Sequence, residues 1–578
     1  MTSRPRELRT HHVPRHRRHG TPGSSSRLMK ASVVMASGSI VSRLLGFVRN
    51  FLFGSILAGS MSSAGSAFSA ANALPNTVWL FVGGGTLNAI LVPAIVRAVK
   101  RPDRGSDYVS RLMTLVSLVS LVLTGLCMLL VPVLLVLTSG SLPPATYALA
   151  VQLGYWMMPQ VFFSALYVMC GQLLNAHDSF GPYQWAPVVN NLIGIVGAAL
   201  FLGMWGAVGD PSQWTLTMIV AMAAINVGGS AGQVVFLTWF VKKLDLRLRP
   251  RWGFRGLGLG KLSRIGLWTL AMLGLGQLGV WATRWSTGGA VHAAEAAGKD
   301  SDLAARYPGL LSIDWAYLAF MIPQGIIAVS LVTAAFPAIS RSAAAGDHAA
   351  ALAAYARTNR LLAVPMVLCT VLFIALAGPI MWAIGGGTGP IGARANGAVL
   401  VGYMLGLVPF AALYLVKRVF YAYEDARVPF YTQIPNTLAS LVGAPIILAV
   451  VDPAWATATA ATVSSVGNLA GWLMALWFLR RRAAALGEAV PGTRKGLVLA
   501  GKLALAALVA WAVGAGLVQL LDGAIWSHRS VAIALGVVIG AVVSAVFLAV
   551  AWLLRVEEVQ RMVGTGTRAL GRLRGATS

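Results

Sequence analysis

The chain has 578 residues, of which 57% are hydrophobic and 11% are charged, and its mean hydropathy is +0.73. Soluble domains contain roughly 25% charged residues, so this composition excludes a soluble globular protein and indicates a polytopic membrane protein. The formal net charge of +27 does not predict a nucleic-acid partner, because the basic residues are distributed over many short loops and both termini.

Apolar stretches of about 20 residues, long enough to cross a hydrocarbon core about 30 Å thick, recur along the chain. We therefore predict an all-α polytopic membrane protein with about 14 transmembrane helices. The predicted spans cover residues 31–57, 71–97, 112–137, 147–174, 184–208, 214–241, 262–285, 312–340, 361–384, 395–421, 428–451, 454–479, 501–521 and 530–554.

Two basic breaks divide these spans into groups of six, six and two. In the first break Lys and Arg alternate with Leu, Trp and Gly, which is typical of a segment that lies on the cytoplasmic leaflet. This layout predicts two six-helix lobes of a transporter and an appended C-terminal helix pair. The predicted parts are a disordered basic tail (1–30), an N-terminal lobe (31–241), an interfacial linker (242–261), a C-terminal lobe (262–480), a linker with the last two helices (481–556) and a basic tail (557–578).

The distribution of the 45 Lys and Arg residues predicts the orientation in the membrane. Most of them fall in alternate loops and in the two tails, whereas the loops on the opposite side contain only Lys299, Arg306, Arg394 and Arg529. Because basic loops stay on the cytoplasmic side, we expect both termini in the cytoplasm.

Two arginines, Arg43 and Arg49, lie inside the first apolar span. A charge at bilayer depth costs roughly 2.5–3.5 kcal/mol, so such residues usually face a water-filled or ligand-filled cavity. On a helix the two side chains would be about 9 Å apart along the axis and roughly 120° apart around it, wide enough for one diphosphate group. The alternative is that Arg49, near the end of its span, extends to the lipid headgroups.

Two further groups of polar residues are candidates for function. Arg418, Glu424, Asp425 and Arg427 follow the tenth span on the cytoplasmic side, where they form either an inner gate or a basic anchor for the topology. Asn190 lies within the fifth span, and its amide must hydrogen-bond to a neighbour or a ligand, so we include it among the candidate substrate-binding residues.

Several classes of site are not predicted. The chain contains no G-x-x-x-x-G-K-[ST] phosphate-binding loop and no soluble domain long enough to hydrolyse ATP. Its three cysteines, Cys127, Cys170 and Cys369, are isolated within apolar spans, so no disulfide or metal site is expected. We expect a transporter without a cofactor, driven by a gradient or a potential, and not an enzyme.

Five stretches in colinear order carry a resemblance to a known family. The run Ser42-Arg43-Leu44-Leu45-Gly46-Phe47-Val48-Arg49 resembles the first-helix signature of the MurJ/MviN family, the lipid II flippases of the multidrug/oligosaccharidyl-lipid/polysaccharide exporter superfamily. The other four stretches resemble its second helix, its 4–5 junction, its eighth-helix exit and its 10–11 junction: 74–76 with 92–93, 174–180 with Pro187 and Asn190, 336–340, and 418–429.

The resemblance implies a two-lobed helical transporter of the bacterial cell membrane with a cationic central cavity. Its substrate would be lipid II, in which a diphosphate joins a long prenyl chain to a disaccharide-pentapeptide. By the motif match, Arg43 and Arg49 would bind the diphosphate, and the last two helices would form a groove for the prenyl tail. The headgroup would move from the inner to the outer leaflet by alternating access.

The chain departs from the family where charged residues are expected. It has Ser66, Trp79, Leu80 and Gly84 at the acidic and arginine positions of the second helix, and Tyr317-Leu318 in place of an Asp-Arg pair in the eighth. A substitute is present in the seventh span, where Gln277 and Arg284 are seven residues apart and share one helix face. Arg284 is therefore the third candidate for the cavity, with Asp314 as its partner; alternatively, Arg284 extends to the outer membrane surface.

Other functions compete with lipid II transport. An exporter of another polyprenyl-diphosphate glycan would need the same arginines. A non-transporting scaffold or regulator that contacts cell-wall synthesis proteins is suggested by the lost charges, but it has no need for Arg43 and Arg49. An ion-coupled drug antiporter fits poorly, because the first six spans contain no carboxylate.

Overall fold

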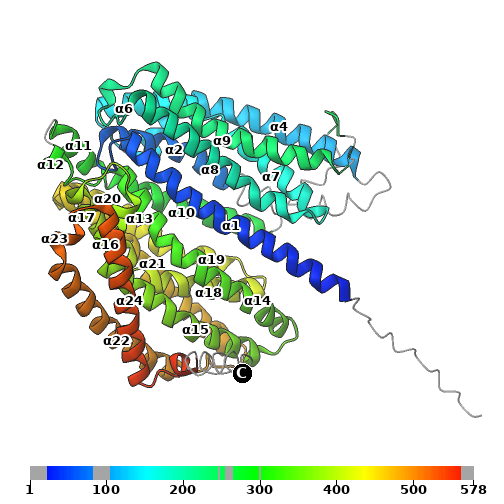
Figure 1. Cartoon of the computed structure of the whole chain (residues 1–578). Coiled ribbons are helices and arrows are strands. Elements are labelled where there is room, and N and C mark those ends of the chain that lie inside the picture. The colour runs from blue at the N-terminus through cyan, green and yellow to red at the C-terminus, as the bar shows by residue number, and fades with distance from the viewer. Residues whose placement is uncertain are drawn as a thin grey trace, which may run out of the picture.

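A computed structural model describes residues 22–81, 105–244, 246, 248–253, 264–298 and 301–561. Within these residues every regular element is a helix, which agrees with the all-α prediction (Figure 1). Gly84, most of both predicted tails and residues 245, 247 and 254–261 of the predicted interfacial linker lie outside the described residues.

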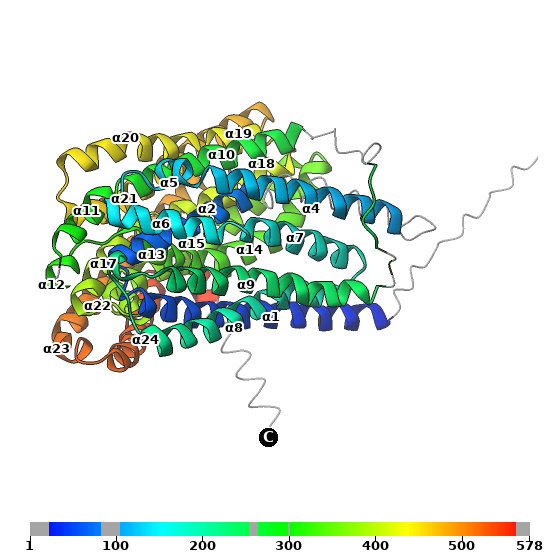
Figure 2. The ribbon, with the colours of Figure 1, turned by 90° about the horizontal axis from the view of Figure 1, so that it is seen from above.

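The N-terminal lobe is a bundle in which α1 packs on α8, α8 and α7 pack on α9, and α2 packs on α6. Figure 2 shows α1, α8 and α9 side by side along one edge. The lobe comprises α1 (Pro22–Ile56), α2 (Ser63–Phe81), α4 (Ser106–Leu129), α5 (Val131–Ser139), α6 (Pro144–Met157), α7 (Gln160–Ala176), α8 (Phe180–Trp205), the 3-10 turn η2 (Pro211–Gln213) and α9 (Leu216–Lys242).

The C-terminal lobe is a second bundle, in which α20 packs on α21 and α10, and α21 packs on α17 and α18. It comprises α10 (Arg264–Trp285), α11 (Gly288–Ala296), α12 (Ser301–Ala304), α13 (Leu310–Pro323), the π-helical turn η3 (Gln324–Ala328), α14 (Val329–Ala344), α15 (His348–Ala375), α16 (Ala377–Ile384), α17 (Pro390–Met404), α18 (Leu407–Ala422), α19 (Arg427–Tyr431), α20 (Ile434–Val450) and α21 (Pro453–Ala485).

The last helices form a separate pair that is attached to the C-terminal lobe. They are α22 (Thr493–Leu520), the short α23 (Asp522–Ile525) and α24 (Arg529–Leu553). Helices α22 and α24 pack on each other, α22 packs on α15, and α24 packs on α16. This arrangement matches the predicted appended pair.

Eleven helical segments in the described residues are long and apolar enough to cross a membrane. Each of these segments coincides with a predicted span. Helices α1, α2 and α10 occupy the other three predicted positions, but their described parts are not long and apolar enough to be counted. The total of 14 therefore stays a prediction. Several spans are divided into two helices next to a proline, which cannot donate a backbone hydrogen bond to the preceding turn: Pro132, Pro159, Pro379 and Pro409.

The two lobes meet at one end of the molecule, where loop 385–389 lies against the end of α1. A Cβ atom at Gly386 would lie 1.7 Å from the backbone oxygen of Phe51, so only glycine allows this close approach. Nearby, Asn396 donates a hydrogen bond of 2.7 Å to the hydroxyl of Ser60. We call this end, defined by loop 385–389 and α11, the sealed end. From there the lobes spread apart toward the opposite end (Figure 1).

Candidate functional site

A cavity of about 400 Å³ lies between the two lobes. Its walls come from α1 and α2 of the N-terminal lobe and from α10 and α13 of the C-terminal lobe. We call it the interlobe cavity. Its polar and charged lining residues are Arg49, Asn50, Ser69, Asn72, Asn76, Thr77, Gln277, Arg284 and Asp314. A ligand in this cavity would therefore contact residues of both lobes.

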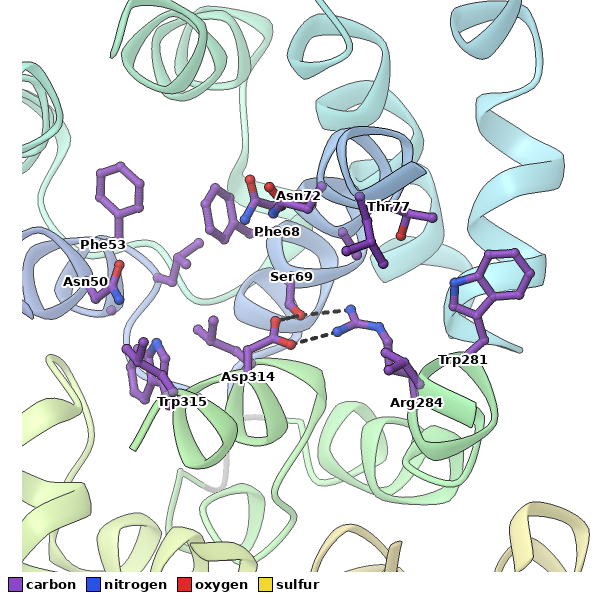
Figure 3. Close-up of a pocket in the computed structure, with 18 of the residues that line it drawn as sticks. Asn50, Phe53, Phe68, Ser69, Asn72, Thr77, Trp281, Arg284, Asp314 and Trp315 are labelled. Carbon is purple, nitrogen blue, oxygen red and sulfur yellow. Dashed lines mark hydrogen bonds and ion pairs between the residues drawn. The ribbon is translucent and has the colours of Figure 1, made fainter. Parts of the chain in front are cut away.

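Arg284 is bound to two neighbours in this cavity, one from each lobe (Figure 3). Its Nη1 atom forms an ion pair with Oδ1 of Asp314 at 2.8 Å, and its Nη2 atom donates to the hydroxyl of Ser69 at 2.9 Å. The hydroxyl of Ser69 in turn donates to the other oxygen of Asp314. The predicted pairing of Arg284 with Asp314 is confirmed. Because the side chain of Arg284 is only 5% exposed, the alternative of extension to the membrane surface is wrong.

Gln277 lines the same cavity, two helical turns from Arg284 on the same face of α10, as its spacing predicts. Its side-chain amide donates to the hydroxyl of Thr77 on α2 at 3.2 Å. Helix α10 of the C-terminal lobe is thus joined to α2 of the N-terminal lobe by two polar contacts, at Thr77 and at Ser69.

Arg49 lines the interlobe cavity from α1. Its Nη1 atom donates to Oδ1 of Asn190 on α8 at 3.4 Å, and its guanidinium lies 5.5 Å from the ring centroid of Phe53. The side chain fits against Gly194, where a Cβ atom would lie 2.4 Å from Cδ of Arg49. Asn190 is therefore a partner of Arg49, which satisfies the need of its amide for a hydrogen bond.

The structure does not bring Arg43 into the same cavity as Arg49. Arg43 is exposed, and its guanidinium lies against Gly325 in the π-helical turn η3 of the opposite lobe, where a Cβ atom would lie 3.1 Å from Nη1. Another residue of the first-helix motif region, Ser42, accepts a hydrogen bond of 2.7 Å at its backbone oxygen from Asn191. Arg43 and Arg49 thus face different elements, η3 and α8.

Uncharged residues occupy the positions where the resemblance in sequence led us to expect charges. Ser66 is buried at the lobe interface, where a Cβ atom at Gly309 would lie 2.5 Å from its hydroxyl oxygen. Trp79 packs near the ring of Tyr167, and Leu318 lines the interlobe cavity. The small Ser66 allows the lobes to approach closely, whereas Arg49, Arg284 and Asp314 supply the charges of the interlobe cavity.

The four residues of the possible inner gate lie around the turn between α18 and α19. Within the described residues, no ion pair joins them to one another. Arg418 donates to the hydroxyl of Tyr414 at 2.8 Å, Oδ1 of Asp425 accepts from the backbone N–H of Arg427 at 3.0 Å, and Glu424 has a positive φ of 56°. A gate at this turn stays a prediction.

Sequence reasoning missed the hydroxyl groups of Ser69 and Thr77, because small polar residues are common packing residues in apolar helices. It also missed a basic contact at the sealed end. The Nη2 atom of Arg529 in α24 donates to the backbone oxygens of Gly385 at 3.0 Å and Thr388 at 2.9 Å, and its guanidinium lies 4.9 Å from the ring centroid of Phe51 in α1.

Among the described residues, no group of three or more His, Cys, Asp or Glu side chains is placed to hold a metal ion.

Comparison with known proteins gives consistent matches. A family model described as "Lipid II flippase MurJ" matches residues 57–523. A probable lipid II flippase MurJ from Buchnera aphidicola subsp. Acyrthosiphon pisum is 23% identical over 436 residues, which cover 73% of this chain and 78% of the relative. One from Synechocystis is 25% identical over 422 residues, which cover 72% of this chain and 75% of the relative.

Solved structures share the fold at lower sequence identity. A lipid II flippase MurJ in an inward closed conformation superposes with a TM-score of 0.66 and 17% identity, over 89% of this chain and 98% of that chain. An inward-facing multidrug-resistance transporter of the MATE family gives a TM-score of 0.55 and 15% identity, over 79% of this chain and 98% of that chain. The larger share of this chain covered by the flippase is consistent with a helix pair added to a two-lobed transporter.

Proposed function

This chain belongs to the MurJ family of lipid II flippases, and we propose that it moves lipid II across the bacterial plasma membrane by binding the diphosphate between its lobes. One observation carries the assignment of the site. Two guanidinium groups from opposite lobes, Arg49 and Arg284, line the same polar cavity. Guanidinium groups bind phosphate oxygens through paired hydrogen bonds, and a diphosphate offers such oxygens on both phosphorus atoms.

Each arginine has a separate role in this proposal. Arg49 binds one phosphate, while Asn190 orients it from α8 through their 3.4 Å hydrogen bond. Arg284 binds the other phosphate after exchanging part of its contact with Asp314. Arg43, which is exposed and lies against the opposite lobe at η3, meets the headgroup on its way into the cavity.

Transport would follow from closing one end of the molecule as the other opens. We assign the sealed end to the outer face, because the basic loops belong to the opposite end and basic loops face the cytoplasm. Both termini would then be cytoplasmic. Separation of Ser60 from Asn396 and of loop 385–389 from α1 would open the outer face. Arg418, Glu424, Asp425 and Arg427 would then lie at the inner closure.

We assign the prenyl tail to a site outside the interlobe cavity. A mostly apolar cavity of about 450 Å³ lies between the C-terminal lobe and α22, with its walls on α15, α18, α21 and α22. Its lining includes Met366, Leu476 and Leu503. Moving a prenyl chain from the bilayer into this groove would gain little free energy, because the surrounding lipid tails are equally apolar. The groove would therefore position the tail without binding it tightly.

The assignment is tested by rescue of a bacterium depleted of its own lipid II flippase. Lipid II in the outer leaflet is measured by its accessibility to an added toxin that cleaves it. We expect the wild type to restore accessible lipid II and growth, and Arg49→Ala and Arg284→Ala to fail at equal protein levels in the membrane. Lys243→Ala, at an exposed lysine that lies over the ring of Trp239, is the control and should rescue.

Three outcomes would contradict the proposal. Full rescue by Arg49→Ala and Arg284→Ala would show that these arginines do not bind the substrate. If the well-expressed wild type fails to rescue but transports a different polyprenyl-diphosphate glycan, that lipid is the substrate. Rescue of growth without accessible lipid II would favour a role as a scaffold for cell-wall synthesis proteins.

A further inference from the structure

A second cavity of about 300 Å³ lies inside the C-terminal lobe, next to the interlobe cavity. We call it the lobe cavity. Its walls come from α10, α13, α17, α18, α20 and α21, together with Leu80 of α2 in the N-terminal lobe. The two cavities share part of their lining, namely Leu80, Gln277, Val280, Arg284 and Asp314. A ligand whose diphosphate lies at Arg284 can therefore extend an attached group into the lobe cavity.

Lys417 is the unusual residue of the lobe cavity. It lies in α18 within an apolar span, lines the cavity, and donates a hydrogen bond of 3.3 Å to the side-chain oxygen of Gln433. Within the described part of the chain, no ion pair includes Lys417. A cation inside a membrane protein without an opposite charge is costly, and such residues face a cavity where a ligand supplies the charge.

The other polar groups of the lobe cavity also favour an anion. Asp314 is the only carboxylate among the described lining residues, and it already pairs with Arg284 at 2.8 Å. The amide of Asn468 accepts a hydrogen bond from Asn436 at 3.1 Å, which leaves its NH2 group as a donor. Tyr403 adds a hydroxyl group. An ammonium, amides and a hydroxyl suit a carboxylate, which accepts several hydrogen bonds at two oxygens.

We propose that the lobe cavity binds a carboxylate of the peptide part of the lipid II headgroup, with Lys417 as the ion-pairing residue. The inference rests on the proposed function, because it places the diphosphate at Arg49 and Arg284. It goes beyond that function by assigning headgroup specificity to the C-terminal lobe. Lys417 thereby distinguishes lipid II from a polyprenyl diphosphate that carries no acidic peptide.

The test measures binding to the purified full-length protein in nanodiscs. Three ligands are compared: lipid II, lipid II whose peptide carboxylates are converted to carboxamides, and undecaprenyl diphosphate. The proteins are the wild type, Lys417→Gln, Lys417→Arg and the exposed-lysine control Lys243→Gln. Thermal unfolding of each variant checks that it is folded.

We expect the wild type and Lys243→Gln to bind the amidated lipid roughly tenfold more weakly than lipid II, as for the loss of one charge-assisted hydrogen bond. Lys417→Gln should bind lipid II about tenfold more weakly than the wild type and should not distinguish the two lipids. Lys417→Arg should keep the discrimination, because it keeps the charge. All four proteins should bind undecaprenyl diphosphate equally.

The inference would be overturned if amidation of the lipid lowered the affinity of the wild type and of Lys417→Gln equally. It would also be overturned if amidation did not lower the affinity of the wild type. Failure of the wild type to bind undecaprenyl diphosphate would instead overturn the proposed function. A chloride-for-gluconate exchange distinguishes a free inorganic anion from the peptide carboxylate. If chloride stabilises the wild type and not Lys417→Gln while amidation has no effect, the site binds an inorganic anion and the inference is wrong.

Discussion

Arg284 and Asp314 form an ion pair of 2.8 Å whose two members are unequally exposed: the arginine side chain is 5% exposed and the aspartate side chain 39%. The cation is therefore fixed in the protein, while the anion faces the interlobe cavity. Asp314 thus occupies the position at which a phosphate of the substrate would meet Arg284. Its carboxylate neutralises the buried arginine in the substrate-free protein and must compete with the substrate.

Asp314→Asn should strengthen the binding of undecaprenyl diphosphate, since the amide keeps a hydrogen bond to Arg284 but removes the competing charge. We expect roughly a three- to tenfold lower dissociation constant, because a half-exposed charge is partly screened. Slower release should reduce transport in the rescue assay. Asp210→Asn, at an exposed carboxylate that accepts hydrogen bonds from Ser212, is the control. Weaker binding by Asp314→Asn would contradict this competition.

Gly194 allows the side chain of Arg49 to lie along α8, and an alanine there should displace it. The added Cβ atom would lie 2.4 Å from Cδ of Arg49, which must move away from Asn190. We expect Gly194→Ala to weaken diphosphate binding about tenfold, equivalent to one hydrogen bond to a charged group, although the variant does not touch the substrate. Gly203→Ala on the same helix meets open space and should bind normally. Equal affinities of the two variants would show that Arg49 finds another productive position.

The ion pair of Arg284 with Asp314 was predictable from the sequence for a simple geometric reason. Gln277 and Arg284 are two helical turns apart, so they share a face wherever the helix lies, and Asp314 begins the next span at the same end of the lobe. The apolar spans and the basic breaks likewise predicted the two bundles and the added pair. These features depend on local spacing and on hydrophobicity, which a single sequence contains.

The placement of the other basic residues depends on neighbouring helices, which a sequence does not reveal. Helical spacing sets the angle between Arg43 and Arg49 around the helix axis. It does not show that Arg43 faces η3 and that Arg49 faces α8. Lys417 and Arg418 are neighbours in sequence, but consecutive helical residues point about 100° apart. Arg418 consequently bonds to Tyr414, while Lys417 faces the lobe cavity.

Arg529 connects the C-terminal helix pair to the sealed end, so its loss should loosen that end. Arg529→Met removes two hydrogen bonds to backbone oxygens and should destabilise the protein by roughly 1–3 kcal/mol. A cysteine in place of the buried Ser60, in a chain without the native cysteines, should then react faster with a maleimide. Arg394→Met breaks a half-exposed ion pair with Asp522 and should leave the labelling rate unchanged. Unchanged labelling in Arg529→Met would exclude this role.

The two lobes approach each other closely through the backbone at Gly386. This glycine lies in the run Gly385-Gly386-Gly387 between α16 and α17, and its neighbour Gly387 has a positive φ of 71°. Consecutive glycines at a break between two spans are a sequence signal for a close backbone contact. A side chain at this position cannot be accommodated by a rotamer change, because the obstructing atom is the backbone oxygen of Phe51.

Gly386→Ala should therefore prevent the sealed end from closing. The added Cβ atom would lie 1.7 Å from the oxygen of Phe51, so α1 and loop 385–389 must separate. If this end faces the outside, the variant stays open to that side, cannot return to load substrate, and fails to rescue at normal membrane levels. Fast maleimide labelling of a cysteine at Ser60 would identify that state directly. Gly389→Ala, three residues further in the same loop, meets open space and should rescue. Rescue by both variants would show that transport does not require closure at this contact.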